Sequence, residues 1–398
     1  MSMRAPLVGA IVALVLAGCA NVPLPPSNAP VSMATPGART TPPAPTQTLQ
    51  RDHARWISAE WSELPGWGGD SVLDAWSALQ RGCVRPAPGW DAVCAEALRY
   101  APQDDTDAML WLMQHLRPWR VESSDGSAQG LATGYFEPQL AGTRTSSSAS
   151  TVPVLAPPRD LWRRQPYLPR REIESSASGS DPIAFVADPL ELAIAQVQGT
   201  GRLRVESADG SPQWLRLSYA GDNGLPYQSV GAWLRARGEL SDASWAGIRD
   251  WARRNPARLR EALWANPRYV FFRAEPLPDP ALGPRGAQGV ALTPGRSVAV
   301  DKLAVPLGTP LWLDTGAPLT NLPLRRLVLA QDTGSAIQGA VRVDLFWGWG
   351  AEAEEQAGKM KQRLRLWALW PRAASVGSSG PAESTQTQRW QARRQSGP

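Results

Sequence analysis

The most informative stretch of this chain is Leu327-Val328-Leu329-Ala330-Gln331-Asp332-Thr333-Gly334-Ser335-Ala336-Ile337-Gln338-Gly339-Ala340-Val341-Arg342-Val343-Asp344-Leu345-Phe346-Trp347-Gly348. Two aspartates, Asp332 and Asp344, each lie beside an apolar run of the kind that forms β-strands. Because Asp344 is flanked by Val343 and Leu345, we expect burial to disfavour its ionised form. A carboxylic acid that keeps its proton near neutral pH is suited to general acid catalysis. The stretch therefore predicts a catalytic acid at Asp344; the alternative is an aspartate that caps a turn at a strand end.

Short strand-type segments dominate the chain from Gly289 onward, at residues 297–300, 310–313, 326–330, 340–346 and 364–370. Strands at this spacing with long polar connections favour a closed barrel. Helix-type apolar spacing with acidic starts is found earlier, at residues 70–78, 91–98 and 105–116, and two further helices are expected over 241–265. The sequence therefore predicts a mainly β chain with a helical amino-terminal part.

The amino-terminal end is typical of an exported lipoprotein. A short basic start and an apolar run too short to span a bilayer lead to Leu16-Ala17-Gly18-Cys19. We expect a signal peptide over residues 1–18 and lipid attachment at Cys19, which would anchor the chain without a transmembrane helix. Ala20, in place of Asp after the cysteine, favours the periplasmic face of the outer membrane by resemblance to sorted lipoproteins. An ordinary secretory signal is the alternative.

Two further segments are expected to lie outside the folded body. Residues 19–50 are rich in Pro, Ser, Ala and Thr and predict a semi-rigid linker, and residues 372–398 predict a disordered tail. The two remaining cysteines, Cys83 and Cys94, form an even pair in an oxidising compartment. A disulfide between them is expected, with two free buried thiols as the alternative.

Composition narrows the chemistry. The net charge is +5, but Lys and Arg are spread along the chain, so nucleic acid is not the expected partner and cell-wall polymer is favoured. The chain has 19 Trp, and some of these rings are suited to stacking on sugars although most must serve packing. The only histidines, His53 and His115, both fall in the predicted helical part. Catalytic triads, metal sites and cofactors are therefore not expected, and carboxylates, hydroxyls and backbone amides must carry any reaction.

Six sequence blocks resemble one family. In chain order they are Thr133-Gly134-Tyr135-Phe136-Glu137-Pro138, Gln198-Gly199-Thr200-Gly201, Tyr219-Ala220-Gly221, Asn266-Pro267-Arg268-Tyr269-Val270-Phe271-Phe272, Gly295-Arg296-Ser297-Val298-Ala299-Val300-Asp301 and the stretch Ala330 to Gly348. They follow the order seen in the membrane-bound lytic murein transglycosylase A family, from about Arg120 to Pro371. Asp301, Asp332 and Asp344 also resemble the three aspartates for which the 3D domain is named.

This resemblance implies a fold and a site. It implies a double-psi β-barrel domain built from residues 51–138 and 279–371, a small β domain inserted over 139–278, and a substrate groove between them. The catalytic residue would be Asp344. The substrate-binding residues would be Thr133, Tyr135, Glu137, Gln198, Gly199, Tyr219, Gln331 and Asp332. Thr200 and Phe136 depart from the usual Ser and Tyr of the pattern, and Phe136 removes one polar group.

The implied activity is cleavage of the β-1,4 bond between N-acetylmuramic acid and N-acetylglucosamine in peptidoglycan, with a 1,6-anhydromuramyl product. A single Asp would act as acid and then as base. The implied partners are peptidoglycan glycan strands, the outer membrane through the lipid anchor, and cell-wall synthesis or division complexes. Two rival interpretations remain open. Asp332-Thr333-Gly334 and Asp314-Thr315-Gly316 resemble aspartic peptidase loops, although they lie close in sequence, and the chain could be a non-catalytic wall-binding lipoprotein.

Overall fold

The computed structural model describes residues 46–175, 180–206, 211–277, 279–320 and 322–372. The predicted signal peptide, Cys19, the linker up to Pro45 and the tail from Ala373 lie outside these residues. No helix in the described part is both long enough and apolar enough to cross a membrane.

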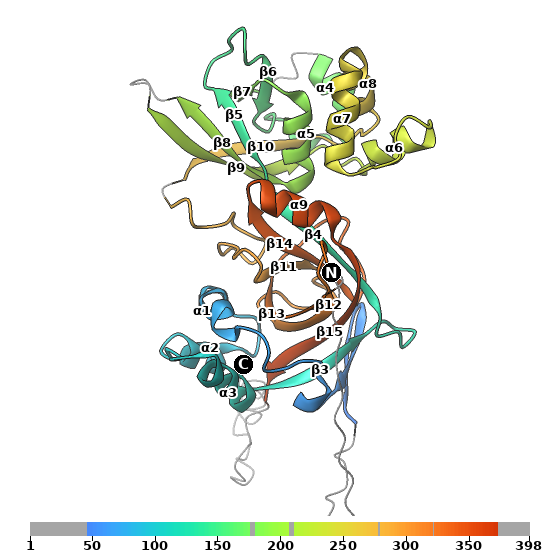
Figure 1. The fold of residues 1–398 in the computed structure, drawn as a ribbon. Coiled ribbons are helices and arrows are strands. Elements are labelled where there is room, and N and C mark those ends of the chain that lie inside the picture. Colours follow the sequence, from blue (N-terminus) through green and yellow to red (C-terminus); the bar gives the residue numbers. More distant parts are fainter. Residues whose placement is uncertain (1–45, 176–179, 207–210, 278, 321, 373–398) are drawn as a thin grey trace, which may run out of the picture. The chain divides into compact units, whose positions relative to one another are not determined.

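One sheet forms a barrel (Figure 1). Six strands follow one another in the order β15 (Lys361–Pro371), β12 (Pro310–Gly316), β13 (Pro323–Asp332), β11 (Ser297–Val300), β14 (Arg342–Trp349) and β4 (Gly130–Glu137). An additional pairing of β4 with β15 closes this row into a ring, which removes the free strand edges. Strands β3 (Leu116–Glu122), β2 (Ala54–Ser58) and β1 (Thr48–Arg51) extend the sheet from β15. The predicted mainly β chain with a barrel is confirmed.

Side chains alternate along the barrel strands between two apolar clusters. The interior holds a continuous buried set that includes Val298, Val300, Leu311, Leu313, Val328, Ala330, Val343, Leu345, Leu364 and Leu366. The outer face of β12, β13 and β15 carries Trp312, Leu327, Leu329, Trp367 and Leu369, which pack with the amino-terminal helices. Each strand is therefore buried on both faces, which explains why these segments read as nearly unbroken apolar runs.

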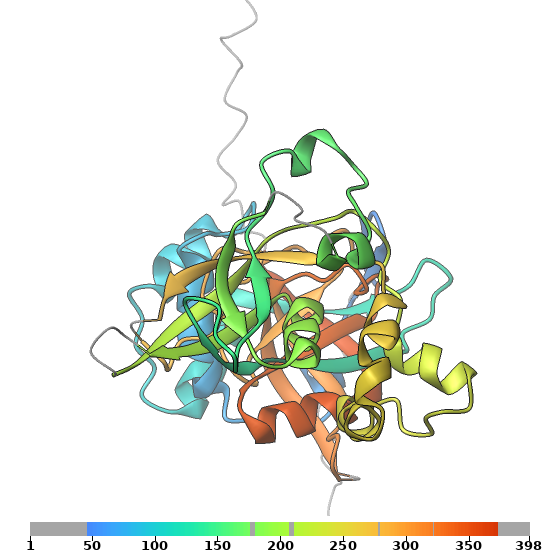
Figure 2. The same cartoon turned by 90° about the horizontal axis from the view of Figure 1, so that it is seen from above.

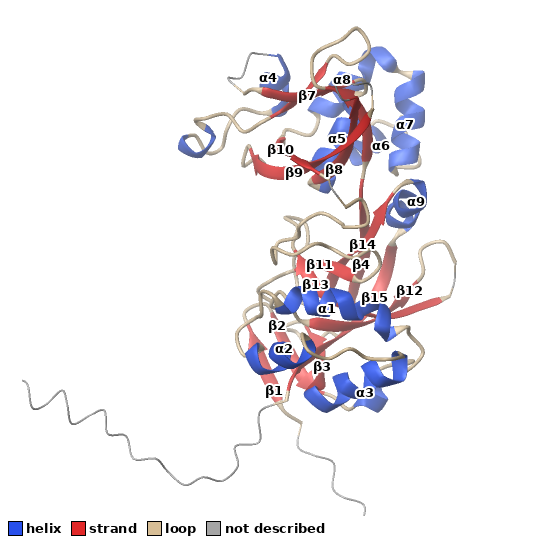
Figure 3. Ribbon diagram, turned by 90° about the vertical axis from the view of Figure 1, so that its left-hand side faces the viewer, coloured by secondary structure: helices blue, strands red, loops and turns tan. Residues whose placement is uncertain are grey.

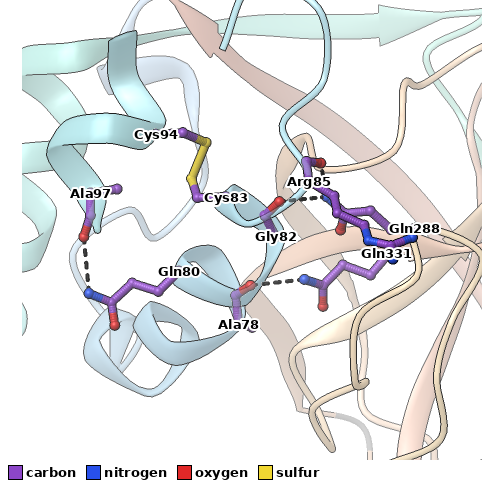
Figure 4. Close-up of a disulfide and its surroundings, with 9 residues drawn as sticks. All are labelled: Ala78, Gln80, Gly82, Cys83, Arg85, Cys94, Ala97, Gln288 and Gln331. Atoms are coloured by element: carbon purple, nitrogen blue, oxygen red, sulfur yellow. Dashed lines mark hydrogen bonds between the residues drawn. A yellow bond between two sulfur atoms is a disulfide. The ribbon is translucent and has the colours of Figure 1, made fainter. Parts of the chain in front are cut away.

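The predicted amino-terminal helices are present as α1 (Trp76–Cys83), α2 (Asp91–Ala97) and α3 (Asp105–His115), shown in blue in Figure 3. The first begins later than the sequence indicated, because Val72–Ala75 forms a short 3-10 helix before it. A disulfide joins Cys83 of α1 to Cys94 of α2, with 4.9 Å between their Cα atoms (Figure 4). The predicted pairing of these two cysteines is therefore present in the structure.

Part of the amino-terminal prediction was wrong. His53 does not lie in a helix; it occupies the turn between β1 and β2, which form an antiparallel hairpin. Strand β1 also begins within the stretch that composition assigned to the linker. Both strands are short, so they give little periodic signal, and β2 pairs with β3 through residues more than 60 positions away.

The inserted part contains a six-stranded sheet in the order β10 (Val270–Pro276), β9 (Pro212–Asp222), β8 (Thr200–Glu206), β5 (Gln139–Thr143), β7 (Pro182–Val186) and β6 (Val152–Leu155). Five helices accompany it in the described residues: α4 (Arg170–Ser175), α5 (Pro189–Gln198), α6 (Val230–Ala236), α7 (Trp245–Arg254) and α8 (Leu259–Trp264). Seen from above, the yellow segment with α6 to α8 gathers to one side of the green strands (Figure 2). The insert is therefore mixed α and β: the two helices expected over 241–265 are present as α7 and α8, whereas α4, α5 and α6 were not expected in a small β domain. Helix α5 was missed because it is buried on most sides and lacks a polar stripe.

One further helix, α9 (Ala351–Lys359), connects β14 to β15 and was not expected. It packs against β4 close to Gly134, the glycine of the Thr133-to-Pro138 block. A Cβ atom at Gly134 would lie 2.6 Å from Trp347 Nε1 and 2.9 Å from Ala357 Cα. The glycine is therefore needed for close approach of helix and strand, and its role in the block is packing.

Candidate active site

Four neighbouring strands place the candidate residues in one row. Ala299 on β11 pairs with Asp332 on β13 at one side and with Asp344 on β14 at the other. On the next strand, β4, Thr133 pairs with Asp344. The backbones of the two aspartates are thus separated by one strand, a distance of about 10 Å at the usual strand spacing. Chain segments more than 150 residues apart meet in this row.

Asp344 points out of the barrel. Its neighbours Val343 and Leu345 belong to the barrel interior, so the alternation of the strand turns the carboxyl to the outer surface. There it lies beside a small apolar cluster made of Tyr135, Leu292, Ala299, Ile337 and Phe346. Val343 and Leu345 indicated a buried strand. The outer apolar cluster explains why the carboxyl of Asp344, on the other face of this strand, is also shielded from water.

The electrostatic environment of Asp344 favours its protonated form. Burial raises the pKa of its carboxyl from the ordinary value of 3.8 to about 6. A hydrogen bond from Thr133 Oγ1 to Asp344 Oδ1, 2.5 Å long, and the charge of Arg342 act in the opposite direction, while the charge of Asp332 raises the pKa further. A carboxyl with this pKa carries its proton in part of the molecules near neutral pH and can both give and take it.

Asp332 is held by two donors. The Tyr135 hydroxyl donates to Oδ2 at 2.8 Å and the Ala287 backbone N–H donates to Oδ1 at 2.9 Å. Burial raises the pKa of Asp332 above its usual value despite these bonds, and it raises the pKa of Tyr135 well above 10. Both carboxylate oxygens therefore have a partner, which fixes the orientation of the side chain.

Asp301, the third aspartate of the 3D pattern, supports turns. Its Oδ2 lies 2.8 Å from His53 Nδ1 and accepts the Gly339 N–H, and its Oδ1 accepts the Leu303 N–H. Burial would raise the pKa of Asp301, but the bonds from His53 and these two amides outweigh it, so the pKa lies below its usual value. Asp301 is therefore an ionised residue that ties three loops together.

Gln198 and Gly199 bring the insert to β4. The Gln198 side-chain oxygen accepts the Phe136 backbone N–H at 3.2 Å, and Gly199 ends α5 in the left-handed conformation at φ 74°. Gln198 also lines a pocket of about 250 Å³, together with Tyr227, with Trp245 of α7 and with residues of α6 and α9. A side chain added at Gly199 would meet no atom within 4 Å, so this backbone faces open space.

Tyr219 lies on β9, near the segment Gln198-Gly199-Thr200. Thr200, at the start of β8, pairs with Ser218 on β9, and Tyr219 is the residue after Ser218. Its ring is 46% exposed, and its hydroxyl donates to Asp222 Oδ2 at 2.5 Å. Asp222 in turn forms an ion pair with Arg268 at 2.7 Å. Tyr219 is therefore an exposed aromatic side chain held in a fixed orientation.

Glu137 and Gln331, which the resemblance implied as substrate-binding residues, lie beneath the surface of this structure. Glu137 is fully buried, and its two oxygens accept bonds from Arg202 Nε at 2.6 Å and Arg216 Nε at 2.9 Å. Gln331 is also fully buried; it donates to the Ala78 carbonyl of α1 (Figure 4). It also accepts a hydrogen bond from Ser297 Oγ. Their contacts in this structure are with other protein groups and support the strands that carry the candidate site.

Two arginines were missed by the sequence interpretation. Arg202 on β8 and Arg216 on β9 lie directly opposite each other and both turn inward to Glu137. The available signal was weak, because each arginine alternates with core-facing leucines or valines and so has the pattern of an ordinary exposed residue. Only the folded arrangement shows that the two cations share one carboxylate from β4.

Comparison with known proteins agrees with this arrangement. A model of the MltA specific insert domain matches residues 131–273, and a model of the 3D domain matches residues 296–370. The chain is 33% identical over 261 residues to membrane-bound lytic murein transglycosylase A of Escherichia coli K12, a match that covers 63% of this chain and 68% of that protein.

Crystal structures of MltA proteins are also similar to this chain. The crystal structure of MltA from Neisseria gonorrhoeae is 32% identical with a TM-score of 0.72, and the match covers 83% of this chain and 96% of that one. The structure of E. coli MltA with bound chitohexaose is 27% identical with a TM-score of 0.63, covering 82% and 96% of the two chains. Since both family models match in order and the E. coli relative is matched over two thirds of its length, this chain belongs to the membrane-bound lytic murein transglycosylase A family.

Proposed function

We propose that this protein is a lytic transglycosylase that cleaves the β-1,4 bond between N-acetylmuramic acid and N-acetylglucosamine in peptidoglycan and leaves a 1,6-anhydromuramyl end. The observation that carries the proposal is Asp344, an outward-facing carboxyl whose burial raises its pKa to about 6 and which has Thr133 as its hydrogen-bond partner. Family membership supports the substrate class, and the E. coli relative binds chitohexaose, a chain of N-acetylglucosamine units.

The proposed reaction uses one carboxyl group twice, first to give a proton and then to take another. Protonated Asp344 gives its proton to the glycosidic oxygen as the bond from C1 of N-acetylmuramic acid to that oxygen breaks. The resulting carboxylate then takes the proton of the C6 hydroxyl of the same sugar, and the C6 oxygen bonds to C1. The ring closure is intramolecular, so it benefits from a high effective concentration of the nucleophile. No water is consumed, and Asp344 ends protonated as it began.

The surrounding residues would bind and orient the sugar. Thr133 would hold the Asp344 carboxyl in one rotamer. Asp332, fixed by Tyr135 and Ala287, would contribute a polar contact and an electrostatic field rather than a base, because both of its oxygens already accept hydrogen bonds. We place Gln198, Gly199 and Tyr219 on the opposite side of the bound glycan, in a groove between the barrel and the insert.

The location of the protein is part of the same proposal. We infer that Cys19 carries the lipid that holds the catalytic body at the periplasmic face of the outer membrane, where it meets peptidoglycan and complexes of cell-wall synthesis or division. The support is the sequence Leu16-Ala17-Gly18-Cys19 and the membrane-bound name of the relatives. Metabolic labelling with a fatty acid should mark the wild-type protein and not Cys19→Ser; equal labelling would remove this part of the proposal.

The aspartic peptidase interpretation fails on geometry. Asp314 on β12 pairs with Arg325, and Asp332 lies seven residues further along β13, so the two Asp-Thr-Gly copies are roughly 20 Å apart along the strand. Asp314 is also occupied by ion pairs with Arg325 and Arg365. Two carboxylates in these positions cannot share a proton.

Product analysis tests the proposed activity. Purified murein should be digested with a soluble fragment that begins at Thr46, ahead of β1, and the products identified by mass spectrometry. We expect 1,6-anhydromuropeptides. Fragments with reducing N-acetylmuramic acid ends would instead indicate a hydrolase that uses water and a second carboxylate, and intact murein would favour a non-catalytic wall-binding protein.

A further inference from the structure

Gln288 ties the segment before β11 to the end of α1. Its side chain is buried, and Nε2 donates to the carbonyl oxygen of Gly82 at 3.0 Å and to that of Arg85 at 3.1 Å (Figure 4). The side-chain oxygen of Gln288 has no hydrogen-bond partner among the described residues. Burial of an unpaired oxygen costs free energy, so packing alone does not explain an amide at this position. The two hydrogen bonds made by the nitrogen are what distinguish this residue from an apolar one.

The same segment binds the candidate site. The Ala287 N–H donates to Asp332 Oδ1 at 2.9 Å, and the next N–H, that of Gln288, donates to the carbonyl oxygen of Gln331 at 3.0 Å. Two consecutive N–H groups thus contact two consecutive residues of β13. The place of the Ala287 N–H relative to the Asp332 carboxyl therefore depends on where Gln288 is held.

Asp332 follows an irregularity in its strand. On β11, Val298 pairs with Ala330 and the next residue, Ala299, pairs with Asp332, so Gln331 is left between the two pairs. A bulge of this kind re-aims a neighbouring side chain and is common beside active sites. The direction of the Asp332 side chain therefore depends on how the bulge is held, and not only on the pairing of β11 with β13.

Both glutamines reach the same helix. Gln331 Nε2 donates to the carbonyl oxygen of Ala78 in α1, four residues before Gly82, which accepts from Gln288 (Figure 4). A Cβ atom at Gly82 would lie 3.3 Å from Gln331 Nε2 and 3.4 Å from Gln288 Nε2, so the glycine lets both amides come close to the helix. The bulge and the segment that binds Asp332 therefore share one support, the carboxyl end of α1.

We propose that Gln288 is a positioning residue for the reaction: by tying its segment to the end of α1, it holds the Ala287 N–H against Asp332 and so fixes the direction of that carboxyl. This inference rests on the proposed function, in which Asp332 orients the substrate, and extends the site to a residue that touches no sugar. The tie ends on backbone carbonyls of a folded helix, so it does not require the disulfide of α1. The alternative is that Gln288 only completes the end of α1 and contributes to stability alone.

A matched pair of variants separates the two roles. Gln288→Met keeps the length of the side chain but removes its donor. The control is Gln80→Met: Gln80 also lies on α1 and donates from Nε2 to two carbonyl oxygens, those of Ala97 at 3.0 Å and Tyr100 at 3.3 Å, but on the side of α2 (Figure 4). Both variants lose two hydrogen bonds to carbonyls, so both should melt at a lower temperature. At a temperature where both are folded, we expect kcat/KM for murein cleavage to fall roughly two- to tenfold in Gln288→Met, the range that corresponds to one hydrogen bond, and to stay at the wild-type value in Gln80→Met.

The pH profile gives a readout that a purely structural role would not move. The Ala287 N–H lowers the pKa of Asp332, and the charge of Asp332 raises the pKa of Asp344. If Gln288→Met loosens the Ala287 bond, Asp332 keeps its proton to a higher pH and Asp344 ionises more readily. The fall of kcat/KM with rising pH should therefore move to lower pH in Gln288→Met and stay in place in Gln80→Met. The other groups that act on the two carboxyls are unchanged in both variants: Thr133, Tyr135, Thr333 and Arg342.

A double-mutant cycle with Asp332→Ala tests whether Gln288 acts through Asp332. Once the carboxyl is absent there is nothing left to position, so adding Gln288→Met should cost no further activity although it still lowers the melting temperature. Three results would overturn the inference: wild-type kcat/KM and pH profile in folded Gln288→Met, an equal loss in Gln80→Met, or an equal loss with and without the Asp332 carboxyl.

Failure of the proposed function would be visible in the wild-type protein alone. Murein products with reducing ends would contradict the proposed function, and the cycle would still show whether Gln288 acts through Asp332. Products with 1,6-anhydro ends together with an additive cycle would contradict only the inference about Gln288.

Discussion

Two shielded carboxylates on the paired strands β4 and β14 differ in their partners. Glu137, at the end of β4, is enclosed by Arg202, Arg216 and Thr200. Asp344 on β14, opposite Thr133 in the middle of β4, has a hydroxyl as its hydrogen-bond partner and a pKa raised to about 6. Burial without a closely bound cation raises the pKa of Asp344, whereas the buried Glu137 is matched by the two arginines that bind it. The first arrangement suits chemistry and the second suits structure, although both residues belong to the same family blocks.

The largest expected effect is on activity and comes from substitution of Asp344. Asp344→Asn keeps the shape of the side chain but cannot deliver a proton, so turnover of murein should fall about a hundredfold to ten-thousandfold while glycan binding is retained. Asp332→Asn should cost less, since we assign that residue to orientation. The measurement is the release of soluble muropeptides by folded protein. Near wild-type release by Asp344→Asn, or complete loss through Asp332→Asn with binding intact, would reverse the assignment.

Glu137→Gln should lower the stability of the fold. The substitution leaves Arg202 and Arg216 buried without an anion, and the free energy of unfolding should fall by about 3 to 5 kcal/mol. The specific activity of the fraction that remains folded should be close to wild type. Denaturant unfolding measures the first quantity. Glu275→Gln, which breaks a pair that is exposed at both partners, is the matched control and should cost less than about 1 kcal/mol.

Asp344→Asn should have the opposite effect on stability. The folded-state pKa of Asp344 is raised from 3.8 to about 6, so the folded protein binds this proton more tightly than the unfolded chain does. Its stabilising contribution is complete below about pH 4, falls as the pH rises to about 6, and is absent above that. At pH 7 the asparagine variant should therefore be more stable, by at most about 3 kcal/mol. Melting temperatures between pH 4 and 8 should diverge as the pH rises; parallel curves would contradict the shift.

The disulfide provides a smaller effect that is confined to stability. Cys83 and Cys94 are 11 residues apart, and in the chain-entropy model a loop of this size contributes about 2.5 kcal/mol. The double Ser variant should melt at a lower temperature but keep its specific activity well below that temperature, because neither sulfur lies near Asp344. A loss of activity without loss of folding would mean that α1 positions the site more directly, through Gln331 and Ala78.

Local patterns allowed much of the barrel to be predicted. The strand at Ser297–Val300 has the expected bounds, and the helices at Asp91–Ala97 and Asp105–His115 end within one residue of their expected ends. The buried strand that carries Asp344 also follows from its two apolar neighbours. In these cases the pattern that determines the structure lies within a few residues of the site.

The rest depended on distant partners. Arg202 and Arg216 are 65 and 79 residues from Glu137, and nothing near Glu137 in the sequence indicates them. The burial of Gln331 against α1 involves a residue 253 positions away. Helix α9 has a weakly apolar face of alanines, which gave little periodic signal. Sequence blocks could therefore locate the site but could not separate the residues that face substrate from those that support them.

The pH dependence of kcat/KM in wild type and Thr133→Val tests the central role of Asp344 most directly. If Asp344 is the acid, wild-type kcat/KM should fall as the pH rises through about 6, because this parameter reports the free enzyme. The Thr133 hydroxyl stabilises the ionised form, so Thr133→Val should raise the pKa and move this fall to higher pH. A fall at the same pH in both proteins, or activity that increases from pH 6 to 8, would contradict the account.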